Sequence, residues 1–172
     1  MKTVYVLRHA KSAWDQTDLA DHERPLNRRG REACESLASH VRRHHVEPAL
    51  VLCSTARRAR QTLDELTRHL GRQWPAEYRD DLYLAEARHM LAILRGLPDG
   101  QPSVMLVGHN PGMAELAEQL CRRPERQRLE ALGAKFPTGA LATFVFEVAR
   151  WRDVAPGQGR LDSYVTPKSL AG

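Results

Sequence analysis

The stretch Val4-Tyr5-Val6-Leu7-Arg8-His9-Ala10-Lys11 places an Arg-His pair directly after an apolar run that contains β-branched residues. A second stretch, Val104-Met105-Leu106-Val107-Gly108-His109-Asn110-Pro111, again delivers a histidine after such a run. Continuous apolar runs of this kind are typical of strands buried on both faces of a parallel sheet. Open α/β sheets bind ligands at the carboxyl ends of their strands, so His9 and His109 are expected to lie at one ligand-binding rim.

The length and composition are those of a globular domain. The 172 residues are 42% hydrophobic and 27% charged, with no low-complexity tract, so one domain over residues 1–172 is expected. The sequence defines the tail from about residue 151 least well. No apolar run approaches the roughly 20 residues of a membrane-spanning helix, and no signal-peptide pattern follows Met1. We therefore expect a cytoplasmic protein with no membrane partner.

The cysteines and the charge exclude several classes of function. Cys34, Cys53 and Cys121 form no CxxC pair, which predicts buried thiols in a reducing compartment, without a disulfide framework or a metal site. The net charge is +5, but the basic residues are spread along the chain and lack interleaved aromatic residues. This pattern argues against nucleic-acid binding and favours an anionic substrate. No cofactor is expected, and nothing in the sequence requires more than a monomer.

Apolar runs alternate with helical stretches along the chain, which predicts a layered α/β domain. Strands are expected at Thr3–Leu7, Leu50–Cys53, Ala76–Arg79, Ser103–Val107 and Ala140–Val148. Helices are expected after an Asn27 N-cap to about His44, from about Ala56 to Leu70, over Arg88–Gly96, and from Pro111 to about Arg122. Asp15–Arg24 is expected to be a loop, Pro124–Arg128 an exposed charged segment, and the chain from Pro156 either an edge strand or unpaired.

A third strand end adds an Arg-rich helix start. The strand expected at Leu50–Cys53 leads into Ser54-Thr55-Ala56-Arg57-Arg58-Ala59-Arg60-Gln61-Thr62. Taken singly, a histidine after a strand is usually structural or solvent-exposed, and an Arg-rich helix start is usually a solvated face. Together, the features at three strand ends favour one site in which guanidinium groups hold a phosphate and an imidazole attacks it.

The order and spacing of these segments resemble the histidine phosphatase superfamily. The resemblance rests on Arg8-His9 followed by a small residue, on Ser54…Arg58-Ala59…Gln61-Thr62, and on Gly108-His109-Asn110-Pro111. The short chain resembles the SixA-type phosphohistidine phosphatases in particular, through Asp21-His22-Glu23-Arg24-Pro25-Leu26-Asn27…Gly30 and Phe136-Pro137-Thr138-Gly139-Ala140. The likeness covers the chain to about residue 148. It implies a three-layer α/β/α sandwich with a mostly parallel central sheet, the phosphoglycerate-mutase-like fold.

The resemblance also implies a metal-independent phosphatase that passes a phosphoryl group to a histidine and then to water. His9 is the implied nucleophile, which must be neutral to attack and which nearby arginines keep neutral by lowering its pKa. Arg8 and Arg58 are implied to bind the non-bridging oxygens, and His109 to donate a further hydrogen bond. The family pattern has its arginine directly before alanine, which selects Arg58 over Arg57.

Three further residues are candidates by position. Asp21 and Arg24 match positions that line the pocket in the SixA-type branch, and the alternative for them is a loop salt bridge of small energetic value. Larger members of the superfamily carry an acidic residue that protonates the leaving oxygen. Glu86 is the best-placed candidate here, although a glutamate favoured at a helix N-terminus explains it equally well. Asp21 could also assist proton transfer.

The sequence shows no clear candidate for the general acid, and this indicates the class of substrate. A phosphoramidate bond is intrinsically labile and depends less on a strong general acid than a phosphomonoester does, which favours protein phosphohistidine. A phosphatase of small phosphomonoesters and a non-catalytic phosphate-binding signalling module remain alternatives. A phosphoglycerate mutase would need large insertions over the pocket. The expected partner is thus a phosphorylated protein or a small phosphorylated molecule, bound in an open, shallow, cationic pocket.

Overall fold

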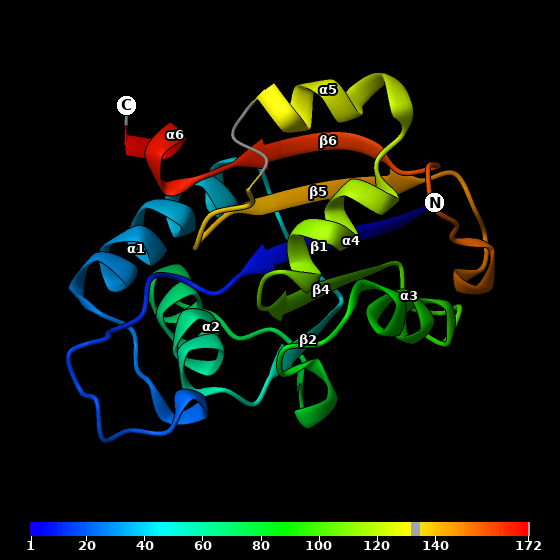
Figure 1. Cartoon of the computed structure of the whole chain (residues 1–172). Helices are drawn as coiled ribbons and strands as arrows, with labels where there is room; N and C mark the ends of the chain where they lie inside the picture. Colours follow the sequence, from blue (N-terminus) through cyan, green and yellow to red (C-terminus); the bar gives the residue numbers. More distant parts are fainter. Residues whose placement is uncertain (132–134, 172) are drawn as a thin grey trace.

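A mostly parallel sheet of six strands forms the centre of the computed structural model, which describes residues 1–131 and 135–171 (Figure 1). The strands are β1 (Lys2–Arg8), β2 (Leu50–Ser54), β3 (Ala76–Arg79), β4 (Ser103–Gly108), β5 (Leu141–Phe146) and β6 (Arg160–Val165), in the spatial order β3-β2-β4-β1-β5-β6. β1 to β4 are parallel, whereas β5 runs antiparallel to β1, and β6 antiparallel to β5. Gly172, the last residue of the predicted tail, lies outside the described residues.

Helices cover both faces of this sheet, which confirms the three-layer α/β/α sandwich. The helices are α1 (Arg28–Arg43), α2 (Arg57–Leu70), α3 (Ala87–Arg95), α4 (Gly112–Leu120), α5 (Arg123–Ala131) and the short α6 (Pro167–Ala171). Leu37 of α1 and Leu63 of α2 share an apolar cluster with one face of the sheet. Met90 of α3 and Leu116 of α4 belong to the cluster on the other face. Figure 1 shows α1 and α2 side by side.

The elements that the sequence predicts well are those whose residues are buried in the structure. All residues of β2, β4 and β5 are buried, so these strands read as continuous apolar runs. β6 pairs only with β5 at the edge of the sheet, so the chain after Pro156 forms an edge strand. The segment expected as exposed charged chain at Pro124–Arg128 lies within the helix α5, which buries Leu129. Within residues 1–131 and 135–171, no helix is both long and apolar enough to cross a membrane.

The register of the central strands brings three strand ends to one rim. Arg8 at the end of β1 lies opposite Gly108 at the end of β4. The next residue, His9, donates its backbone N–H to the Gly108 carbonyl at 3.0 Å. β2 pairs with the other side of β4, and its last residue, Ser54, leaves the sheet at the same rim. The Arg-His pair, His109 and the start of α2 therefore emerge next to one another.

Candidate active site

A pocket of about 380 Å³ lies at this rim. Four of its lining side chains are cationic, namely Arg8, Lys11, Arg24 and Arg58. Asp21 is the only carboxylate among the lining residues that the structure describes. The same pocket is lined by His9 and His109, so six of the seven residues singled out in the sequence come together here. Its charge suits an anionic ligand.

His9 is held as a neutral imidazole with one nitrogen available. Its Nδ1 lies 2.7 Å from the carbonyl oxygen of Ala10, and because a carbonyl only accepts, Nδ1 carries the proton. Burial, opposed in part by this hydrogen bond and aided by the charges of Arg58 and Arg8, lowers the pKa of His9 to about 3. At neutral pH, Nε2 therefore keeps its lone pair, which a nucleophile requires.

His109 faces the ring of His9 with 5.2 Å between the ring centroids. Its Nε2 lies 2.8 Å from Oγ of Ser54, and that oxygen accepts the backbone N–H of Ala56 at 3.2 Å. If the hydroxyl of Ser54 donates to Nε2, the proton of His109 is on Nδ1. Burial, with the neighbouring His9 and Arg58, lowers the pKa of His109 to about 3, so the ring is a neutral donor.

Two arginines add further donors from separate elements. Arg58, at the start of α2, is only 3% exposed and donates to the carbonyl oxygen of Asp21 at 2.7 Å and to its Oδ2 at 3.0 Å. Arg8 donates to the carbonyl oxygen of Phe136 at 3.2 Å, and Asn110 donates to the same oxygen at 2.9 Å. Burial and the charge of Arg58 lower the pKa of Arg8. Both guanidinium groups are fixed by contacts that leave their Nε atoms unused.

Three buried nitrogens of the pocket residues have no hydrogen-bond partner among the described residues. They are Nε of Arg8, Nε of Arg58 and Nδ1 of His109. Leaving a buried donor unpaired costs about 1–3 kcal/mol, more for a charged group. The same three residues line the pocket, so a ligand with several acceptor oxygens, such as a phosphoryl group, is the kind of partner that they lack. The arrangement can bind an oxyanion beside Nε2 of His9.

Asp21 is an anion that positions two of the cations. Its carboxylate also accepts from Nε of Arg24 at 3.2 Å and from the hydroxyl of Tyr83. Burial raises the pKa of Asp21, but the hydrogen bonds from Tyr83 and Arg58 outweigh it and lower the pKa to about 2. At neutral pH this carboxylate has no proton to donate. Tyr83, whose ring packs edge-on against His109, has no motif that would have flagged it in the sequence.

The remaining motif residues hold the loop that follows β1. The hydroxyl of Thr62 accepts the backbone N–H of Ala10 at 2.9 Å and donates to the carbonyl of Arg58 at 2.7 Å. The side-chain oxygen of Gln61 accepts the backbone N–H of Leu26 at 2.8 Å. The spacing from Arg58 to Thr62 therefore reflects one helix turn that brings Arg58 to the pocket and also fastens the loop beside it.

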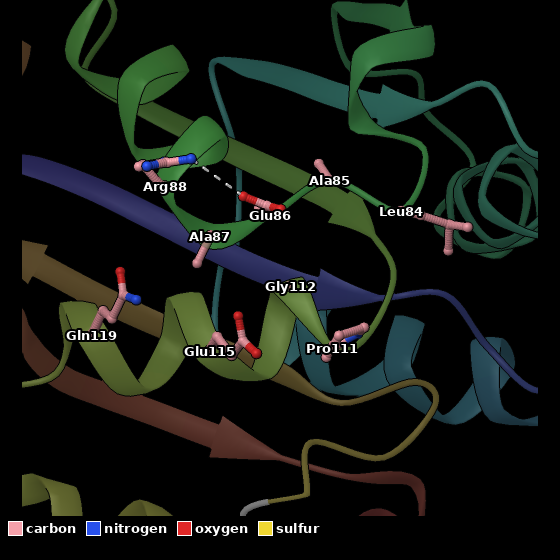
Figure 2. A pocket seen from close by; sticks show the side chains of 9 residues that line it. All are labelled: Leu84, Ala85, Glu86, Ala87, Arg88, Pro111, Gly112, Glu115 and Gln119. Carbon is pink, nitrogen blue, oxygen red and sulfur yellow. Dashed lines mark ion pairs between the residues drawn. The ribbon is translucent and has the colours of Figure 1, made fainter.

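Glu86 is not brought into this pocket. It lines a neighbouring hollow of about 320 Å³, and its carboxylate is exposed and pairs with Arg88 at 3.7 Å. Figure 2 shows the Glu86 side chain directed towards Arg88, while Leu84 points the other way. Glu86 directly precedes α3, which is the helix N-terminal position offered as its alternative explanation. The structure therefore gives this residue no contact with the two histidines.

The cysteines offer no competing nucleophile. Cys34, Cys53 and Cys121 are buried and unbridged. Burial raises the pKa of the Cys34 and Cys53 thiols to about 12, so neither is a thiolate at neutral pH. In the part of the chain that the structure describes, no three His, Cys, Asp or Glu side chains group as a metal site would need.

Comparison with known proteins identifies similar chains. The profile of the histidine phosphatase superfamily (branch 1) matches residues 4–89. An uncharacterised protein of Mycobacterium tuberculosis is 36% identical over 165 residues, which cover 94% of this chain and 100% of that protein. The phosphohistidine phosphatase SixA of Escherichia coli is 31% identical over 120 residues, covering 69% of this chain and 73% of SixA. A crystal structure assigned as the phosphohistidine phosphatase SixA of Agrobacterium tumefaciens superimposes with a TM-score of 0.82 at 32% identity, covering 96% of this chain and 98% of that one.

Proposed function

Because the chain belongs to the histidine phosphatase superfamily, in the branch of the SixA-type phosphohistidine phosphatases, we propose that it hydrolyses phosphohistidine in proteins without a metal ion. One observation carries the proposal. Arg8, Arg58 and His109, each with a buried nitrogen that has no partner among the described residues, line the same pocket as His9, whose Nδ1 is bound to the Ala10 carbonyl, so that Nε2 is left to attack. A phosphoryl group is the ligand that uses both features at once.

The reaction proceeds in two transfers. In the first, Nε2 of His9 forms a bond to phosphorus while the bond from phosphorus to the substrate imidazole, protonated on its other ring nitrogen, breaks. The departing ring keeps the electron pair and leaves as a neutral imidazole. Arg8, Arg58 and His109 stabilise the charge on the transferring oxygens. In the second, water attacks the phosphorylated His9, releases inorganic phosphate and returns the lone pair to Nε2.

Neither candidate carboxylate can act as a proton donor in the pocket, which favours a substrate whose leaving group is a nitrogen. Asp21 is ionised, with a pKa lowered to about 2, and Glu86 lies outside the pocket. The alcohol of a phosphomonoester would leave as an alkoxide and so depends on a proton donor. An imidazole that carries a proton on its other ring nitrogen leaves as a neutral molecule. Phosphohistidine therefore fits the pocket better than a stable phosphomonoester. A phosphatase of small phosphomonoesters is the second candidate, favoured only by the general affinity of the pocket for phosphoryl oxygens.

Phosphate release from a phosphohistidine-bearing protein and from small phosphomonoesters, with chelator present, tests this proposal. We expect turnover of the phosphohistidine protein to exceed that of the phosphomonoesters. His9→Ala should lower turnover by roughly 10³-fold or more, because it removes the nucleophile. His44→Ala, at an exposed histidine at the end of α1, is the matched control and should leave turnover unchanged. Near-normal turnover by His9→Ala would refute the mechanism. Equal turnover of both substrate classes would refute the substrate assignment.

A further inference from the structure

Two further hollows share lining residues with the catalytic pocket. One, of about 540 Å³, shares Lys11, Ser12 and Trp14 with the catalytic pocket, and we call it the Trp14 arm. The other, of about 320 Å³, shares Leu84 with the pocket, and we call it the Leu84 arm. The Leu84 arm lies between residues 84–88, where the chain enters α3, and the start of α4 (Figure 2). We call the catalytic pocket, which His9 lines, together with the two arms the groove.

The two arms carry opposite charge. In the Trp14 arm, three cationic side chains, Lys11, Arg28 and Arg31, outnumber the single carboxylate of Asp15. In the Leu84 arm, two carboxylates outnumber the one cation, and Figure 2 shows them on different segments, Glu86 directly before α3 and Glu115 on α4.

The charges of the Leu84 arm stay available to a partner. Glu86 and Arg88 lie 3.7 Å apart with side chains 77% and 91% exposed. An ion pair this exposed is weak, because water screens both charges.

Exposed apolar side chains mark both junctions with the catalytic pocket. Trp14 is 74% exposed, and its ring lies 3.4 Å from the guanidinium carbon of Arg24, which fixes the indole beside the pocket. Leu84 is 52% exposed and has a φ of 53°, in the left-handed region that a leucine rarely adopts. Strained backbone of this kind is concentrated at functional sites. Both side chains are placed where a bound polypeptide would cover them.

We propose that this groove binds the polypeptide on both sides of the phosphorylated histidine, with acidic residues in the Trp14 arm and basic residues in the Leu84 arm. This inference rests on the proposed function, because only a protein substrate extends beyond the catalytic pocket. The opposite charges of the arms exclude a uniformly anionic partner such as a nucleic acid, which Glu86 and Glu115 would repel. The apolar anchors contribute binding, and the charges select the substrate and set its direction.

Phosphohistidine peptides with designed flanks test the groove. One peptide has glutamates before and lysines after the phosphohistidine, a second has the reverse order, and a third has alanines on both sides. Free phosphohistidine is the small substrate. We expect one of the two bipolar peptides to show a KM roughly 3- to 10-fold below that of the alanine peptide, as expected for a few exposed charge pairs.

Charge reversal in each arm identifies the contacts. Glu115→Lys should raise KM for the preferred peptide roughly 3- to 10-fold, and replacing the peptide's lysines by glutamates should restore it. Glu118→Lys, exposed on the same helix but outside the arm, is the control. In the Trp14 arm, Arg28→Glu should act in the same way, with the exposed neighbour Arg29→Glu as the control. None of these variants should change kcat/KM for free phosphohistidine.

The results of these experiments test the groove and the proposed phosphatase activity separately. Equal KM for all peptides, or equal effects of Glu115→Lys and Glu118→Lys, would overturn the groove and leave the proposed function standing. Failure to hydrolyse any phosphohistidine compound would overturn both.

Discussion

Replacing Ser54 by alanine isolates the hydrogen bond that orients His109. Ser54 is completely buried, and its Oγ lies 2.8 Å from Nε2 of His109 while it accepts the backbone N–H of Ala56. Without this hydroxyl the neutral imidazole can carry its proton on either nitrogen. Only the form protonated on Nδ1 can donate to a phosphoryl oxygen, so Ser54→Ala should weaken catalysis without touching the substrate.

The geometry sets the size of this effect. His109 is 3% exposed, and its Nε2 has no second partner in the site. A buried polar atom left unpaired costs about 1–3 kcal/mol. If that cost falls on the transition state, kcat/KM drops roughly 5- to 150-fold, since about 1.4 kcal/mol corresponds to a factor of ten.

A double-mutant cycle decides whether Ser54 acts through His109. We would measure kcat/KM for free phosphohistidine in Ser54→Ala, His109→Ala and the double variant, with the exposed Ser36→Ala as a control. If Ser54 acts by fixing the ring, Ser54→Ala has no further effect once His109 is absent. Nitrogen NMR of His109 should show protonated Nδ1 in the wild type and mixed protonation in Ser54→Ala. Additive losses in the cycle, or an unchanged proton position, would refute the reasoning.

Three other outcomes follow from the structure. Because the pKa values of His9 and His109 are lowered to about 3, the unfolded chain binds protons first as pH falls, so the free energy of unfolding should decline from about pH 6.5 towards 3. Urea unfolding at pH 7 and pH 4.5 should show the decline, and a smaller one in His9→Ala. Glu86→Gln should keep kcat for free phosphohistidine within about twofold, because its carboxylate lies outside the pocket; a tenfold loss would restore Glu86 as the proton donor. A Cβ at Gly112 would lie 1.9 Å from the Ala85 carbonyl oxygen, so Gly112→Ala should destabilise the fold by roughly 1–3 kcal/mol. Gly100→Ala meets no atom within 4 Å and should stay within about 0.5 kcal/mol in the same urea titration.

Helices and strands could be predicted wherever their burial produces a recognisable hydrophobic pattern in the sequence. β1, β2 and β4 lie within one residue of their expected ends, because the middle of each strand is buried and mostly apolar. α5 was not recognised as a helix because, apart from Leu129, its residues with described burial are polar or only partly buried. β6 was left open because a register shift opposite Thr143 and Phe144 breaks the alternation that marks an edge strand.

Some residues of the site could likewise be predicted from local sequence patterns, and others could not. Arg8, His9 and His109 could be placed together because each follows a strand of one parallel sheet, and the register of β1 against β4 fixes their separation. The contacts of Ser54 with His109 and of Tyr83 with Asp21 join residues 55 and 62 positions apart, and no local pattern encodes them. Glu86 was a candidate because of its sequence position, but the conformation of the turn after Leu84 directs it elsewhere.

The same cations account for a neutral His9 and for the lack of a general acid in the pocket. Burial and the charges of Arg58 and Arg8 keep His9 neutral by lowering its pKa. Arg58 also favours the ionised form of a carboxyl group: together with the hydrogen bond from Tyr83, its hydrogen bond and its charge lower the pKa of Asp21 against the effect of burial. A carboxylic acid in contact with these arginines would therefore lose the proton that a general acid must donate. A pocket built to keep an imidazole neutral among arginines is thereby suited to substrates that supply their own good leaving group. Among phosphorylated protein side chains, phosphohistidine has that property because its phosphorus is bonded to an imidazole nitrogen.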